Sequence, residues 1–174
     1  MRRLILLRHA KSARPPGVAD ADRPLAPEGR QAAPRMGAYL RDEGLFPDLA
    51  LVSSSRRTRE TWDLAGAPLG DVEVRFDPRI YEAPAERLLT VLRETEPEVQ
   101  ALLMVGHNPG FEDLARRLVG HGDRSAQADL AKSFPTSAVA VIDFAVEAWD
   151  RVAFRGGRLD RLVTPKSLGA GEDD

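Results

Sequence analysis

The chain has 174 residues, of which 43% are hydrophobic and 30% charged, a formal net charge of -2 and no cysteine. Its length suits a single domain with a core of its own. The small net charge offers no basic field for nucleic acid or an anionic membrane, so we expect neither partner. The lack of cysteine excludes disulfides, thiolate nucleophiles and cysteine metal sites.

The N-terminal stretch MRRLILLRHA joins basic residues to a short apolar run. That run of about five residues is too short for the core of a signal peptide, and no segment approaches the roughly 20 apolar residues of a membrane span. We therefore expect a cytoplasmic protein. Composition predicts one domain over residues 1–165 and a flexible acidic tail over residues 166–174.

Short apolar runs alternate with helical patterns along the chain. Continuous apolar runs predict buried strands at 4–7, 48–54, 101–106 and 137–144, and an alternating segment predicts an edge strand at 72–76. Apolar residues at helical spacing predict helices over 28–42, 54–66, 84–95 and 109–120. Pro34 should kink the first helix or mark its true start. This order predicts a three-layer α/β/α domain with a largely parallel central sheet.

Polar residues follow three of the predicted buried strands directly. They are Arg8-His9 after the first, Ser53 to Arg57 after the second, and Gly106-His107-Asn108 after the third. Ligands of such folds bind beyond the carboxyl ends of the strands, so these residues should converge if the sheet is parallel. Asn108 is a plausible N-cap, with Pro109 as the first residue of the helix that follows.

Two arginines and two histidines would form a strongly cationic pocket, which suits phosphate oxygens. A histidine in such a pocket acts as a general acid or base, or attacks phosphorus and becomes phosphohistidine. Attack requires a neutral imidazole whose other nitrogen keeps its proton against an acceptor, often a backbone carbonyl. With no cysteine and no Walker loop, a histidine is the best nucleophile candidate in the chain.

Four motifs in order resemble the histidine phosphatase superfamily (branch 1), and specifically its small bacterial SixA-type phosphohistidine phosphatases. The motifs are RHA at 8–10, RPLAPEG at 23–29, SSSRRTRET at 53–61 and GHNPG at 106–110. The resemblance implies a phosphoglycerate-mutase-like fold and a phosphatase without metal or cofactor. The family often has an RHG motif, whereas this chain has Ala10, which fits the SixA-like subset and makes a left-handed backbone there unexpected.

The resemblance also implies roles for matching residues. His9 would be the nucleophile, Arg8 would bind phosphoryl oxygens, and His107 would stabilise charge on the transferred group. The pattern S-x-x-x-R-x-x-x-T places Arg57, not Arg56, at the second arginine. Glu82, at the position matching an L-x-E segment, would be the proton donor. The remaining expected substrate contacts are Asn108, Ser12 and Arg23.

The absence of a long insertion leaves little material for a lid, which favours a protein substrate over a small enclosed one. We therefore expect a phosphatase for phosphohistidine on proteins. The alternatives are a small-molecule phosphomonoesterase for sugar or nucleotide phosphates and a non-catalytic phosphate-binding protein; a phosphoglycerate mutase is the least favoured. The sequence does not indicate the oligomeric state.

Overall fold

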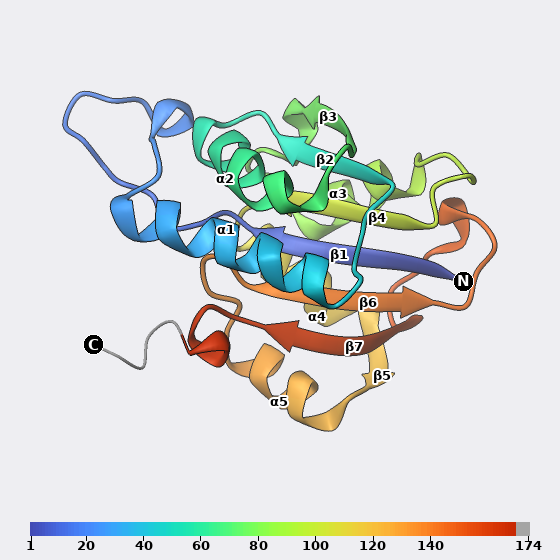
Figure 1. Cartoon of the computed structure of the whole chain (residues 1–174). Coiled ribbons are helices and arrows are strands. Elements are labelled where there is room, and N and C mark those ends of the chain that lie inside the picture. Colours follow the sequence, from blue (N-terminus) through green and yellow to red (C-terminus); the bar gives the residue numbers. More distant parts are fainter. Residues whose placement is uncertain (170–174) are drawn as a thin grey trace.

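The computed structural model describes residues 1–169 and contains one seven-stranded sheet covered by helices (Figure 1). The strands are β1 (Arg2–Arg8), β2 (Leu49–Ser53), β3 (Glu73–Asp77), β4 (Ala101–Gly106), β5 (Val119–Gly122), β6 (Val139–Phe144) and β7 (Gly157–Val163). The α-helices are α1 (Pro27–Asp42), α2 (Arg56–Gly66), α3 (Ala85–Arg93), α4 (Gly110–Leu118) and α5 (Arg124–Lys132). Five 3-10 turns complete the fold: η1 (Asp20–Asp22), η2 (Ala67–Leu69), η3 (Pro78–Ile80), η4 (Trp149–Arg151) and η5 (Lys166–Leu168).

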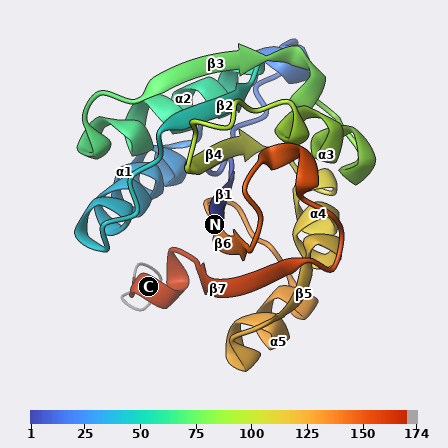
Figure 2. The ribbon, with the colours of Figure 1, turned by 90° about the vertical axis from the view of Figure 1, so that its right-hand side faces the viewer.

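The strands follow the order β3-β2-β4-β1-β6-β7-β5, which Figure 2 shows from top to bottom. Four of the six strand pairings are parallel, and the two that involve β6 are antiparallel. The expected α/β fold with a largely parallel sheet is therefore confirmed. The segment 72–76 was expected at an edge, and β3 lies there.

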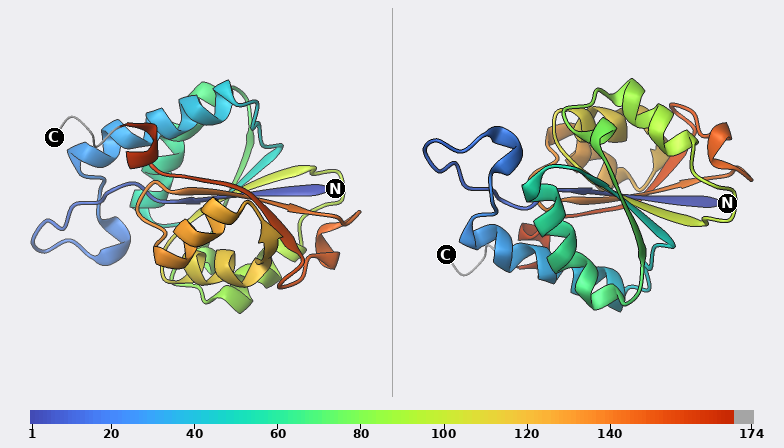
Figure 3. Two further views of the ribbon diagram at one scale, coloured as in Figure 1. Left: turned by 90° about the horizontal axis from the view of Figure 1, so that it is seen from below. Right: turned by 90° about the horizontal axis from the view of Figure 1, so that it is seen from above.

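Helices α1 and α2 cover one face of the sheet, and α3, α4 and α5 cover the other (Figure 3). The apolar run of β1 serves both layers because successive side chains point to opposite faces of a strand. Leu4 and Leu6 pack with the α3–α5 layer, whereas Ile5 and Leu7 pack with the α1–α2 layer. Burial on both faces explains why β1 reads as a continuous apolar run rather than an alternating one.

Close packing in the α1–α2 layer depends on a glycine. A Cβ atom added at Gly37 in α1 would lie 2.0 Å from the carbonyl oxygen of Ala65 in α2. The two helices can approach this closely only where one of them lacks a side chain. This contact packs α2, which carries Arg57, closely against α1 in the same layer.

The predicted helices form with small differences at their ends. Helix α1 runs through Pro34 rather than starting there, and α2 begins after Ser55, whose side chain accepts a hydrogen bond from the Thr58 amide. Helix α4 begins at Gly110, so the expectation that Pro109 is its first residue is wrong. Asn108 nevertheless caps this end, because its Oδ1 accepts a hydrogen bond from the Glu112 amide at 3.2 Å.

The predicted domain of residues 1–165 and its tail meet near η5, where Leu168 packs partly buried against the α1–α2 core. The rest of the predicted tail, residues 170–174, lies outside the described residues. No helix within residues 1–169 has both the length and the apolar character that crossing a bilayer requires.

Candidate active site

The parallel register of β1 and β4 brings the two pocket histidines side by side. Arg8 pairs with Gly106 in this register, and the His9 amide continues the ladder by donating to the Gly106 carbonyl at 3.0 Å. The rings of His9 and His107 consequently lie 5.5 Å apart, centroid to centroid. Both residues are buried, with 7% of their surface exposed. The convergence expected from strand ends is thus present in the structure.

His9 is held in one tautomer by its neighbour. Its Nδ1 lies 2.7 Å from the backbone oxygen of Ala10, and a carbonyl can only accept a hydrogen bond. Nδ1 therefore carries the proton, and the lone pair is on Nε2. Burial, together with charge repulsion from Arg57 and Arg8, lowers the pKa of His9 to about 4. The imidazole is thus neutral at physiological pH, as nucleophilic attack requires.

Long-range proton–nitrogen NMR spectra of the imidazoles test this state of His9. We expect the Nδ1–H tautomer, with no titration of His9 from about pH 8 down to about pH 5 and protonation only near its lowered pKa. The His9→Ala variant identifies the resonances by removing them. An Nε2–H tautomer would contradict the assignment of the proton to Nδ1. Titration of His9 near 6.5, the ordinary pKa of a histidine side chain, would contradict the lowered pKa.

His107 is positioned by Ser53, the first residue of the motif SSSRRTRET, to which the sequence analysis assigned no role. Its Nε2 lies 2.7 Å from the hydroxyl oxygen of Ser53, which is fully buried at the end of β2. Within residues 1–169, its Nδ1 is buried without a hydrogen-bond partner. Burial lowers the pKa of His107 to about 3, and the neighbouring His9 and Arg57 contribute. The sequence signal for Ser53 is its place at the end of β2, which runs parallel to β4.

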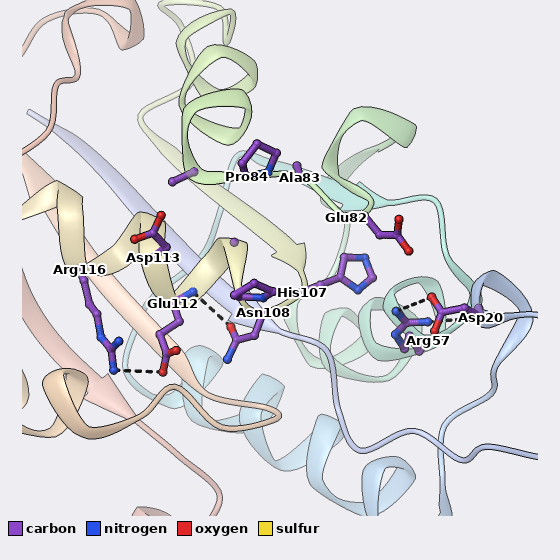
Figure 4. Close-up of a pocket in the computed structure, with 13 residues that line it drawn as sticks. Asp20, Arg57, Glu82, Ala83, Pro84, His107, Asn108, Glu112, Asp113 and Arg116 are labelled. Carbon is purple, nitrogen blue, oxygen red and sulfur yellow. Dashed lines mark hydrogen bonds and ion pairs between the residues drawn. The ribbon is translucent and has the colours of Figure 1, made fainter.

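Arg57, rather than Arg56, points into the site. Arg57 is 6% exposed and donates from Nη1 and Nη2 to the backbone and side-chain oxygens of Asp20, whereas Arg56 is exposed and pairs with Glu60 on the surface of α2. Figure 4 shows Arg57 turned toward Asp20 on one side of His107. No acidic partner was expected for this arginine, because Asp20 comes from η1, outside the three strand-end turns.

The loop before β6 supports the other side of the site. Arg8 Nη1 donates to the Phe134 carbonyl at 3.2 Å, and the Asn108 side-chain amide donates to the same oxygen at 2.7 Å. Glu112 accepts a hydrogen bond from the Phe134 amide at 3.0 Å. The backbone of one residue, Phe134, thus links the first strand end, the third strand end and α4. Asn108 is therefore held in place by protein contacts at both ends of its amide.

Glu82 lines a pocket together with Arg57, His107 and Asn108, whereas His9 and Arg8 are not among its lining residues. The backbone of Glu82 is left-handed at φ 55°, which is uncommon for a residue other than glycine. The pocket has a volume of about 670 Å³. Its charged lining residues are Asp20, Arg57, Glu82, Glu112, Asp113 and Arg116. In Figure 4, Asn108, Glu112 and Arg116 lie on the side of His107 opposite Arg57 and Asp20. The structure therefore places Glu82 in the pocket that His107 lines.

Ser12 and Arg23 lie together in the β1–α1 connection but do not line this pocket. Arg23 donates to the Ser12 hydroxyl at 2.5 Å, to the Ala13 carbonyl at 3.1 Å and to Asp20 at 3.0 Å. Its guanidinium is thus engaged within the connection itself. The assignment of Ser12 and Arg23 to substrate binding stays a prediction.

Comparison with known proteins identifies the family and supports the fold. The sequence profile of the histidine phosphatase superfamily (branch 1) matches residues 4–104, more than half of the chain. The chain belongs to this superfamily. An uncharacterized protein of Mycobacterium tuberculosis is 36% identical over 138 residues, which cover 78% of this chain and 85% of that protein.

Two solved structures place this histidine phosphatase among the SixA-type members. A structure from Nakamurella multipartitia assigned as a SixA phosphohistidine phosphatase superposes with a TM-score of 0.83 at 29% identity, covering 94% of this chain and 96% of that one. One from Agrobacterium tumefaciens with the same assignment has a TM-score of 0.80 at 31% identity, covering 94% and 98%. The SixA-type resemblance and the phosphoglycerate-mutase-like fold are confirmed.

The geometry of this histidine phosphatase can support phosphoryl transfer. A neutral imidazole with a free Nε2 lies beside a second histidine, with Arg8 and Arg57 close enough to lower the pKa of His9. Family membership and the SixA-type neighbours together support phosphatase activity. Ala10, where an RHG motif has glycine, keeps an ordinary negative φ, as expected.

Proposed function

We propose that this protein is a metal-independent phosphatase that removes phosphoryl groups from phosphohistidine on proteins through a transient phosphohistidine on His9. The observation that carries the proposal is the neutral His9 imidazole, whose Nδ1 faces the Ala10 carbonyl and whose Nε2 is free to attack. The arginine guanidinium groups supply the positive charge that a metal ion supplies elsewhere.

The reaction has two displacements at phosphorus. In the first, the lone pair of His9 Nε2 forms a bond to phosphorus as the bond to the substrate nitrogen breaks, and the leaving imidazole takes up a proton. We assign delivery of this proton to Glu82, which lines the pocket. In the second, water attacks the phosphoryl group on His9 as the bond between phosphorus and Nε2 breaks, and the proton from water returns to the Glu82 carboxylate, giving inorganic phosphate and the free imidazole. Arg8, Arg57 and His107 stabilise the phosphoryl oxygens in both steps.

The charge of the pocket favours a protein substrate over a small anionic one. Four carboxylates, from Asp20, Glu82, Glu112 and Asp113, line the pocket against the guanidinium groups of Arg57 and Arg116. A phosphorylated sugar acid would bring a further negative charge against these carboxylates, whereas a phosphorylated imidazole on a peptide brings only its phosphoryl group. Two connections at the pocket are short, at 78–84 and 107–109, and leave room for a partner surface on their side. The β1–α1 connection at 9–26, which contributes Asp20, is longer.

A substrate panel tests this choice. We expect kcat/KM to be about 100-fold higher for a phosphohistidine peptide than for glucose 6-phosphate or AMP. The small phosphates lack the peptide, and with it the contacts around the pocket that would stabilise the transition state of the preferred substrate. The same peptide carrying phosphoserine is the matched control for the nitrogen-linked phosphoryl group. Higher kcat/KM on a sugar or nucleotide phosphate would establish the small-molecule phosphomonoesterase instead. Phosphate binding without turnover of any substrate would establish the non-catalytic alternative.

A further inference from the structure

The acidic side chain of Asp20 lies beside Arg57 on one side of the cationic site. The Asp20 carboxylate accepts hydrogen bonds from Arg57 Nη2 at 3.1 Å and from Arg23 Nη1 at 3.0 Å, and the Tyr81 hydroxyl donates to its Oδ2. The Asp20 backbone oxygen accepts a further hydrogen bond from Arg57 Nη1 at 2.8 Å. The side chain is nevertheless 45% exposed, so burial does not force these contacts.

Tyr81 links the Asp20 carboxylate to His107, because its hydroxyl donates to Asp20 and its ring packs against His107. The edge of the Tyr81 ring meets the His107 ring at 87°, with the centroids 5.4 Å apart. The Arg57 guanidinium carbon lies 5.9 Å from the centre of the same ring, within the range of a cation–π contact. Asp20 therefore holds Arg57 directly, and it holds through Tyr81 the ring against which both Arg57 and His107 pack.

We propose that Asp20 is a positioning residue, which fixes Arg57 directly and His107 through Tyr81 in the arrangement that receives a phosphoryl group. The proposal rests on the proposed phosphatase function, because it assigns Asp20 to the same site. Arginine has a long side chain, and a geometry fixed in advance removes the entropic cost of ordering it when substrate binds.

Asp20 can position Arg57 without competing with phosphate, because it does not use all the hydrogen-bond donors of Arg57. A guanidinium group has five N–H donors, and Asp20 accepts from two nitrogens of Arg57. Within residues 1–169, the Nε of Arg57 has no hydrogen-bond partner. Donors therefore remain for a phosphoryl group while Asp20 stays bound.

The charge of Asp20 is also compensated within its own connection. Arg23, anchored by Ser12 and the Ala13 carbonyl, supplies a second cation to the carboxylate. The hydrogen bond from Tyr81, with those from Arg23 and Arg57, holds the pKa of Asp20 well below its usual range. Burial and the bond to Asp20 raise the pKa of Tyr81 to about 12. Asp20 therefore stays ionised and the Tyr81 hydroxyl stays protonated near neutral pH, so the hydrogen bond between them persists.

Asp20→Ala and Asp22→Ala form a matched pair for the test. Asp22 lies in the same η1 turn, is exposed, and its removal changes the net charge equally. We expect Asp20→Ala to weaken binding of inorganic vanadate about 10-fold and to lower kcat/KM by about 10- to 100-fold, since small displacements of a positioned group have effects of this size. Asp22→Ala should change neither quantity by more than about twofold. Asp20→Asn, which keeps a side-chain oxygen as acceptor, should recover part of the loss.

Tyr81→Phe provides a second variant that preserves the ring and removes only the hydroxyl. We expect a smaller loss of kcat/KM than for Asp20→Ala, together with a change in the imidazole NMR signals of His107. Tighter vanadate binding by Asp20→Ala would show that Asp20 competes with phosphate and would overturn the proposal, as would equal effects of Asp20→Ala and Asp22→Ala. Because vanadate binding needs no turnover, an inactive wild-type protein that binds vanadate in an Asp20-dependent way would refute the phosphatase function and support the positioning role.

Discussion

Replacing His9 by alanine is expected to reduce phosphohistidine hydrolysis by about 10⁴-fold or more, the scale of loss seen when a catalytic nucleophile is removed. The reason is that the structure leaves one nitrogen of this neutral imidazole free beside the arginines, and no thiol exists in the chain to replace it. Steady-state turnover measures the loss. Brief incubation with a radiolabelled substrate, followed by denaturation, should capture a base-stable and acid-labile label on the wild-type protein and none on His9→Ala.

The exposed His121 in β5 is the matched control for this experiment, since it is the one histidine of the chain other than His9 and His107. We expect His121→Ala to keep both turnover and label. Circular dichroism of both variants checks that the fold persists. Unchanged turnover in His9→Ala, or a label that survives the substitution, would refute the phosphohistidine mechanism.

The second large effect concerns Arg57. Arg57→Ala should lower kcat/KM by about 10²- to 10³-fold, as removal of one preorganised donor to a developing charge does. The loss should appear in kcat as well as KM. The reason is that Arg57 is expected to bind the phosphoryl oxygens more strongly in the transition state than in the bound substrate. Arg57→Lys should remain impaired, since an ammonium group cannot hold Asp20 and phosphate with the same planar set of donors.

Arg56→Ala is the control for Arg57→Ala, because it removes an equal charge from the preceding residue of the same helix. Arg56 pairs with Glu60 on the surface, and such exposed pairs contribute little to stability. We expect kcat/KM of Arg56→Ala to stay within about twofold of the wild type. Equal losses of kcat/KM in the two variants would mean that the positive charge of α2, rather than the direction of the Arg57 guanidinium, determines the activity.

Much of the fold follows from local pattern. The apolar runs of β1, β2 and β4 are long and uninterrupted because both faces of these strands are covered, so they are visible in the sequence. β7 was not predicted, because it carries Arg158, Asp160 and Arg161 among its apolar residues and pairs with β6 across a register shift. α5 was missed for a related reason: only Ala126 and Leu130 of this helix are buried, which leaves no clear stripe.

The sequence by itself determined which residue types reach the strand ends, and hence that His9 and His107 would meet in a cationic setting. The choice of Arg57 over Arg56 came from the family resemblance, through the pattern S-x-x-x-R-x-x-x-T, and the structure agrees in geometry. The inference about the two histidines succeeds because parallel strands bring their carboxyl ends to one edge, so position along the chain predicts position in space.

Tertiary structure alone decided the contacts that adjust these groups. Asp20 reaches Arg57 from a connection without regular pattern, and Ser53 reaches His107 through the register between β2 and β4. The proton on His9 Nδ1 is likewise set by the direction of a single carbonyl, that of Ala10. Hydrogen bonds depend on angles and on distances of a few tenths of an ångström, which residue order does not encode locally. The sequence therefore predicts which residue types form the site, whereas only the tertiary structure shows the hydrogen bonds that orient them.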